Sequence, residues 1–211
     1  MGIVYFIIIL TFLFALIITP LTIKFANKFG FVDIPKDSRR VHVKPMPRIG
    51  GLAIVISMFL GLAVYCLITM NIPTISLNKK FVGFAIGAII ISSMGFIDDA
   101  INLRARYKFV FQLVAAIVVY FFGIAIEGIK IPFIYTDLID FGFLSFPVTL
   151  IWIIGLTNAV NLIDGLDGLA AGISVISATA LLTIFITTSA SLEAIVITAV
   201  LLRCCTWIFT I

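Results

Sequence analysis

The sequence predicts an all-α integral membrane protein in which about seven helices cross the bilayer. Of its 211 residues, 63% are hydrophobic and only 11% are charged, and the mean hydropathy is +1.29. A soluble domain is about half apolar and a quarter charged. The apolar runs are too long for barrel strands, and helices are the other fold that satisfies backbone polar groups in lipid. We therefore expect one polytopic helical bundle over residues 1–211.

Seven apolar runs, separated by polar segments, give the expected spans. They cover residues 3–23, 50–70, 81–97, 109–126, a fifth run from Pro147, then 169–187 and 192–211. The first run lacks a basic region before it and a cleavage site after it, so we interpret it as a retained helix. Residues 127–146 alternate aliphatic and aromatic side chains, which favours a small hairpin at the membrane surface.

Lysine and arginine are distributed unequally between two sets of loops. Residues 24–48 hold seven and residues 100–108 hold three, whereas the opposite loops hold only Lys79, Lys80 and Lys130. Cytoplasmic loops carry the excess of positive charge, so the N-terminus is expected outside. Alternating spans then bring three polar segments to the cytoplasmic face, namely the 24–48 loop, Asp98-Asp99 and the stretch from residue 158.

The third of these segments carries a polar side chain at every third position, at Asn158, Asn161, Asp164 and Asp167. Such groups are costly at the end of a membrane helix and indicate a functional site. In a helix they form one slowly drifting stripe. The alternative interpretation is a polar helix end punctuated by Gly165 and Gly168.

Two adjacent carboxylates, Asp98 and Asp99, follow the third apolar run. Carboxylates of this kind suit Mg²⁺, which takes one or two of them and completes its shell with water and substrate phosphate oxygens. The alternative is structural, with the two acids capping the next helix or pairing with Arg104 or Arg106.

The basic loop supplies phosphate-binding candidates at its end. They are Arg39, Arg40, His42, Lys44 and Arg48. Arginine makes bidentate contacts with phosphate, although a basic segment beside a membrane helix also binds anionic lipid headgroups. The net charge of +4 is small, and the basic residues are concentrated in a few segments. This distribution favours membrane lipid and phosphate ligands over nucleic acid.

Carboxylates, a divalent cation and a cationic loop at the cytosol–membrane boundary suit phosphoryl transfer between a soluble phosphate donor and a lipid acceptor. The metal neutralises phosphate oxygens while a carboxylate positions or deprotonates the nucleophile. These residues indicate the reaction class without identifying the donor.

Three segments together resemble the polyprenyl-phosphate N-acetylhexosamine-1-phosphate transferases, also called the glycosyltransferase 4 family. They are Asp33-Ile-Pro through His42-Val-Lys-Pro-Met-Pro-Arg-Ile-Gly-Gly-Leu-Ala, Gly95-Phe-Ile-Asp98-Asp99 with Leu103, Lys108 and Gln112, and Asn158 through Gly172. They occur in the family order and span nearly the whole chain. The family includes the phospho-N-acetylmuramoyl-pentapeptide transferase of peptidoglycan synthesis and the enzymes that start teichoic acid and lipopolysaccharide O-antigen synthesis.

The resemblance implies a bacterial plasma-membrane enzyme with a cytoplasmic site. There the phosphate of undecaprenyl phosphate attacks the β-phosphate of a UDP-N-acetylhexosamine, with Mg²⁺ or Mn²⁺ as cofactor, and UMP is released. Asp98 and Asp99 are the implied catalytic pair, with Asp98 a candidate base, and Asp99, Asp164 and Asp167 are the implied metal ligands. The implied substrate-binding residues are Lys108, Asn158, Asn161, Asp164, Asp167, Arg48 and His42. The segment Arg39-Arg40-Val-His42 resembles the GlcNAc-1-phosphate branch of the family, which favours UDP-GlcNAc as the donor. Whether the protein forms a homodimer is left open.

The chain also departs from the family pattern. Family members continue beyond the seventh helix into a Gly-Asp-x-Gly-Ser type motif, whose aspartate is the principal metal ligand, and a histidine-rich motif; neither occurs before Ile211. We therefore expect a C-terminally truncated member, comprising the N-terminal portion of the family domain. A non-catalytic homologue with part of the site is one alternative, and a transporter is another. Clustering of the polar groups at one face, away from mid-span, disfavours transport.

Overall fold

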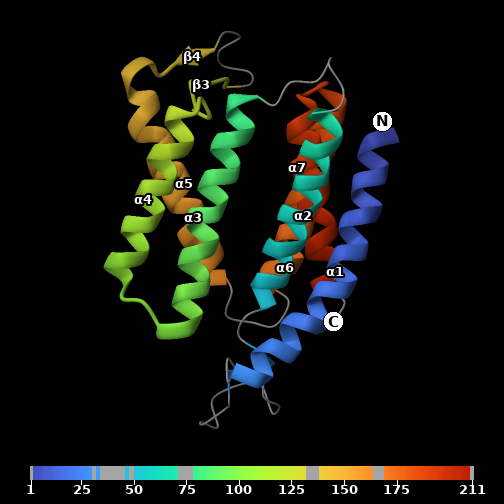
Figure 1. Cartoon of the computed structure of the whole chain (residues 1–211). Helices are drawn as coiled ribbons and strands as arrows, with labels where there is room; N and C mark the ends of the chain where they lie inside the picture. The colour runs from blue at the N-terminus through green and yellow to red at the C-terminus, as the bar shows by residue number, and fades with distance from the viewer. Residues whose placement is uncertain are drawn as a thin grey trace. The chain divides into compact units, whose positions relative to one another are not determined.

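The computed structural model describes residues 2–29, 32–33, 46–47, 50–70, 78–131, 138–163 and 169–209. Seven α-helices account for most of these residues, which confirms the all-α class. The chain divides into two compact units, one formed by Met1–Ser76 with Asp164–Ile211 and the other by Leu77–Ile163 (Figure 1). Each unit is described separately.

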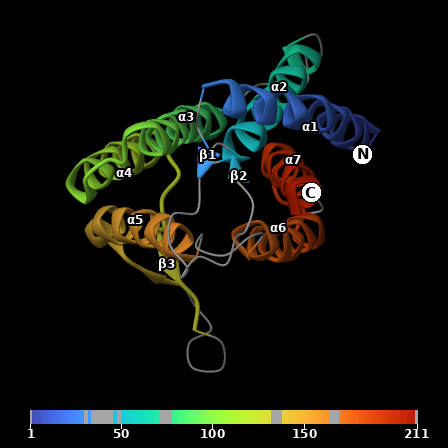
Figure 2. The same ribbon diagram turned by 90° about the horizontal axis from the view of Figure 1, so that it is seen from below.

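The first unit contains four helices, α1 (Gly2–Phe29), α2 (Gly50–Met70), α6 (Leu169–Thr187) and α7 (Leu192–Phe209). Helix α7 packs against the other three, and α1 also packs against α2 (Figure 2). Two short strands, β1 (Val32–Asp33) and β2 (Met46–Pro47), form an antiparallel pair. A Cβ on Gly61 of α2 would overlap the side chain of Thr11, so the glycine lets α1 and α2 approach closely.

Helix α1 is longer than the sequence predicts. It continues through Pro20 and includes Lys24 and Lys28, so the predicted end near Ile23 is wrong. Membrane helices tolerate proline because neighbouring helices and Ser or Thr side chains satisfy the freed backbone groups. Threonine hydroxyls near Pro20 bond to other carbonyls of α1, from Thr19 to Ala15 and from Thr22 to Thr19, and not to the Leu16 carbonyl, which the proline leaves without its helical N–H donor.

The second unit contains α3 (Lys79–Ile101), α4 (Ala105–Phe121), β3 (Gly128–Ile129), β4 (Ile139–Asp140), the 3-10 helix η1 (Gly142–Leu144) and α5 (Ser145–Ile163). Helix α4 packs against both α3 and α5. The antiparallel pairing of β3 with β4, with Gly128 opposite Asp140, confirms the predicted hairpin. Its position at the membrane surface stays a prediction.

Small residues bring α3 and α4 into close contact. A Cβ on Gly83 would overlap the Phe122 side chain, and one on Gly87 would lie 2.5 Å from Cγ2 of Val119. On α4, Ala115 and Ala116 are buried. Close backbone approach at small residues is the usual way in which membrane helices pack, because the hydrophobic effect contributes little between helices in lipid.

Four predicted boundaries in this unit are wrong. Helix α3 continues past Asp99, α4 begins at Ala105 instead of Phe109 and ends five residues before Ile126, and α5 begins before Pro147. Asn78 starts α3 by accepting a hydrogen bond from the Lys80 amide at 3.2 Å. Asn102 ends it in the left-handed conformation, with φ of 49°, which asparagine tolerates better than most residues.

Among the residues that the structure describes, five helical segments are long and apolar enough to cross a membrane, namely α1, most of α2, α3, η1 with α5, and α6. The chain is therefore a multi-pass membrane protein. Helices α4 and α7 have 17 and 18 residues, at the short end of the range for a span. The total of seven spans and the external N-terminus stay predictions.

Candidate functional site

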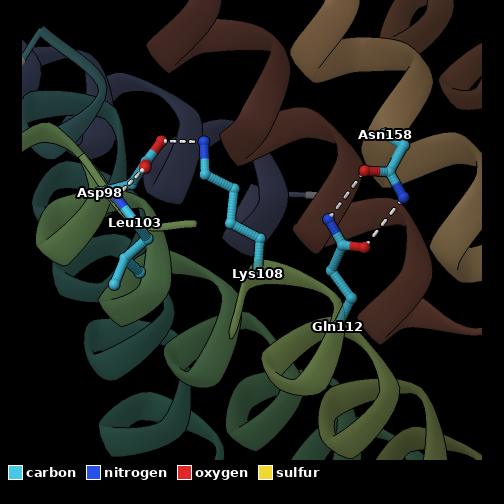
Figure 3. A network of polar contacts seen from close by, with 5 residues as sticks. All are labelled: Asp98, Leu103, Lys108, Gln112 and Asn158. Carbon is cyan, nitrogen blue, oxygen red and sulfur yellow. Dashed lines mark hydrogen bonds and ion pairs between the residues drawn. The ribbon is translucent and has the colours of Figure 1, made fainter. Parts of the chain in front are cut away.

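Asp98 closes the turn between α3 and α4. Its backbone carbonyl accepts the Asn102 N–H at 2.8 Å, and its carboxylate Oδ1 accepts the Leu103 N–H at 2.9 Å (Figure 3). The last carbonyls of a helix and the amides beyond it lack partners within the helix. The backbone and side chain of Asp98 satisfy two of these amides, so the turn and this carboxylate hold each other in place.

The second oxygen of the same carboxylate pairs with a lysine at the start of α4. Oδ2 of Asp98 lies 2.6 Å from Nζ of Lys108, and the two side chains are 21% and 26% exposed. Lys108 was expected in a loop and instead lies in the first turn of α4, where it, and not Arg104 or Arg106, is the described partner of Asp98. The ion pair therefore joins the end of α3 to the beginning of α4 while it stays accessible to a ligand.

Helix α4 is joined to α5 by a reciprocal pair of side-chain amides, which we call the amide lock. Nδ2 of Asn158 donates to Oε1 of Gln112 at 2.9 Å, and Nε2 of Gln112 donates to Oδ1 of Asn158 at 3.2 Å (Figure 3). Asn158 Nδ2 also donates to the Ile154 carbonyl at 2.9 Å. Gln112 is 2% exposed, so it lies in the interface between the helices. Asn158, predicted to bind substrate, has both N–H groups engaged within the protein.

Asp99 and Asn161 complete the described part of the predicted site. Asp99 is partly exposed and follows Asp98 in the last turn of α3; consecutive helical residues do not share a face, so its carboxylate leaves the helix in another direction. Asn161 lies one turn beyond Asn158 on α5 and is exposed. These two residues extend the polar region beyond the ion pair and the lock.

Four other predicted site residues, Asp164, Asp167, His42 and Arg48, lie outside the described residues. Helix α5 ends at Ile163, so the predicted polar stripe is helical at Asn158 and Asn161, and its continuation stays a prediction. Within the described ranges, no three His, Cys, Asp or Glu side chains form a group suited to a metal ion.

Gln112 was not among the predicted site residues, although it stood in one of the segments that carry the family resemblance. The available signal was its spacing. It follows Lys108 by four residues, which places both side chains on one face of a helix. Its partner is 46 residues away in sequence, and no local pattern specifies that contact.

Comparison with known proteins tests the family resemblance of the polar segments. Residues 81–210, more than half of the chain, match the family described as glycosyl transferase family 4. The chain belongs to glycosyl transferase family 4. The match includes α3, α4 and α5, and therefore the ion pair and the amide lock.

Curated relatives of the chain are named as phosphosugar transferases, and two of the three given below are named for a polyprenyl phosphate. A probable undecaprenyl-phosphate N-acetylglucosaminyl 1-phosphate transferase of Bacillus subtilis is 42% identical over 168 residues, which are 80% of this chain and 44% of the relative. A decaprenyl-phosphate N-acetylglucosaminephosphotransferase of Mycolicibacterium smegmatis is 37% identical, over 74% of this chain and 38% of the relative. A phospho-N-acetylmuramoyl-pentapeptide-transferase of Listeria innocua is 33% identical, over 79% of this chain and 55% of the relative. The chain thus spans about half the length of the curated relatives it matches.

A double-mutant cycle tests the ion pair. We expect Asp98→Asn and Lys108→Met, made singly and together, to show a coupling free energy of about 1 kcal/mol in unfolding measured in detergent micelles. Asparagine keeps an oxygen for the Leu103 amide, so the cycle isolates the charge interaction. Asp140→Asn combined with Lys108→Met is the control, because Asp140 lies in the hairpin beyond the far end of α4 (Figure 1). Equal coupling in the two cycles would show that the pair contributes no specific interaction.

Proposed function

We propose that the chain is a phosphotransferase which moves GlcNAc-1-phosphate from UDP-GlcNAc to undecaprenyl phosphate and releases UMP. The observation that carries the proposal is the Asp98–Lys108 pair at the end of two membrane-associated helices, within a segment that matches glycosyl transferase family 4. The relatives named for GlcNAc transfer reach 42% identity, against 33% for those named for muramoyl-pentapeptide transfer, which favours GlcNAc as the sugar. We place the site at the cytoplasmic face of a bacterial plasma membrane.

The ion pair suits a reaction between two phosphates. An ammonium group has three donors, and Asp98 occupies only part of the Lys108 donor capacity, so Lys108 can also bind a phosphate oxygen. When it does, the Asp98 carboxylate is left beside the lipid phosphate and can accept its proton. The lipid phosphate oxygen then forms a bond to the β-phosphorus of the donor, and the bond from that phosphorus to the oxygen of UMP breaks.

Mg²⁺ is the cofactor that this proposal requires, with Mn²⁺ as a substitute. Carboxylate oxygens are the ligands that a hard cation such as Mg²⁺ prefers. The proposed ligands are Asp99, Asp164 and Asp167, of which the last two lie outside the described residues. When bound, the metal would neutralise charge on the donor's diphosphate. His42 and Arg48 are proposed to bind phosphate or nucleotide, and Asn161 to contact the donor.

A non-catalytic homologue is the competing proposal. It corresponds to the alternative interpretation of the sequence, a homologue that keeps only part of the nucleotide and lipid-phosphate site. Such a protein would bind a donor or lipid phosphate without transferring sugar. The two proposals therefore differ in turnover.

Transfer of radiolabelled GlcNAc into extractable lipid by the purified chain tests the proposal. We expect Asp98→Asn and Lys108→Met each to lower turnover by about 100-fold or more, because proton transfer and phosphate binding are lost. Lys130→Met is the matched control, since Lys130 is exposed and follows β3 at the other end of α4. A folded wild-type chain without transfer would support the non-catalytic homologue.

Metal removal tests the cofactor separately. Chelation with EDTA should stop transfer, and added Mg²⁺ should restore it. Asp99→Asn should raise the Mg²⁺ concentration needed for half-maximal transfer by about tenfold or more, as loss of a ligand or its support usually does. Asp140→Asn should leave this concentration unchanged. Full activity in the presence of excess chelator would contradict the assignment of a metal.

A further inference from the structure

The interface between α4 and α5 is held differently at its two ends. Near the end of α4, Tyr120 stacks edge-on against Phe146 with ring centroids 4.9 Å apart. Close by, the Thr149 hydroxyl accepts the Ile126 N–H at 2.9 Å and donates to the Ser145 carbonyl at 2.7 Å. Near the middle of α4, the amide lock between Gln112 and Asn158 is the described polar contact with α5.

The lock joins the first part of α4 to the last part of α5, so the two helices run antiparallel. Lys108 lies four residues before Gln112, and Asn161 lies three residues after Asn158. At 1.5 Å per residue, these displacements are about 6 Å and about 4.5 Å toward the same end of the helix pair. The lysine on α4 and the asparagine on α5 are therefore each one turn beyond the lock.

We infer that the amide lock is a positioning device that sets the spacing between Lys108 and Asn161, with Gln112 and Asn158 as positioning residues. Both N–H groups of Asn158 are engaged, by Gln112 and by the Ile154 carbonyl, so its amide serves the helix contact. Asn161 is exposed and makes no described side-chain hydrogen bond, so it is available to a ligand. The inference rests on the proposed function, because it gives Lys108 and Asn161 a shared substrate.

Two reciprocal hydrogen bonds give the lock a defined geometry. One amide face must meet the other in plane, so rotation of α4 or sliding of α5 breaks both bonds together. An apolar contact at the same place would allow sliding. A shift of about 1 Å in a catalytic group can lower turnover by about 100-fold, so such a contact is worth more to positioning than to stability.

Gln112→Met tests the inference, because methionine fills the interface with similar length and removes both hydrogen bonds. We expect kcat for sugar transfer to fall by about tenfold or more. Thr149→Val is the matched control, since it removes the two hydrogen bonds that the Thr149 hydroxyl makes at the other end of α5. It should lower the unfolding temperature at least as much as Gln112→Met while kcat per folded molecule stays unchanged. A Gln112→Met kcat within twofold of wild type would overturn the inference.

An exchange of the two side chains provides the rescue. Gln112→Asn shortens one arm of the lock and Asn158→Gln lengthens the other, so each single variant should lose kcat. The double variant keeps the combined length and both amides. Its log kcat should recover at least half of the decrease seen in the slower single variant. A double variant as slow as the slower single variant would contradict positioning by the lock.

Amide hydrogen exchange in lipid nanodiscs separates failure of the lock from failure of the proposed function. Gln112→Met should accelerate exchange at residues 159–163, whereas Thr149→Val should not. If the wild-type chain transfers no sugar but shows this exchange pattern, the proposed function fails and the lock stands. Unchanged exchange at residues 159–163 in Gln112→Met shows that no lock exists, whatever the activity.

Discussion

The ion pair between Asp98 and Lys108 determines where the polar residues of the second unit meet. Each charge lies at the helix end that the backbone dipole disfavours, a carboxylate at the end of α3 and a cation at the start of α4. Neither helix carries a charge of the favourable sign in these turns. The pair offsets both costs across a short turn. Local sequence preferences are usually violated in this way at functional sites, where the exposed part of the charge is needed for a ligand.

Packing around α4 turns this local contact into a larger site. Glycines on α3 bring the ion pair's two helices close together, and the amide lock ties α4 to α5. Because the aromatic pair at the far end fixes the other part of the interface, α4 has little freedom to rotate. Its lysine is consequently paired with a carboxylate on one neighbour, one turn from the lock that joins α4 to the other neighbour. A cation held in this way suits a substrate with more than one phosphate.

The sequence was sufficient to predict most of the helices and some of the site. Apolar runs identified residues 50–70 and 169–187 with the boundaries that the structure shows. They failed at the start of α4, because Arg106 and Lys108 resemble a basic loop, whereas in the structure they lie in the helix that follows the turn closed by Asp98. The candidate acids were recognisable because carboxylates are energetically unfavourable at the end of a membrane helix. The pairing of Asp98 with Lys108, and of Gln112 with Asn158, depends on helix packing and has no signature in the local sequence.

The central claim is that this chain transfers a sugar together with its phosphate, and the identity of the released nucleotide tests it most directly. The purified chain would be supplied with Mg²⁺, undecaprenyl phosphate and UDP-GlcNAc, and the nucleotide and lipid products would be identified by mass spectrometry. Attack of one phosphate on the other predicts UMP and a lipid diphosphate bearing GlcNAc, in equal amounts. Release of UDP, with a sugar joined through a single phosphate, would contradict the account, as would a folded chain that forms neither product.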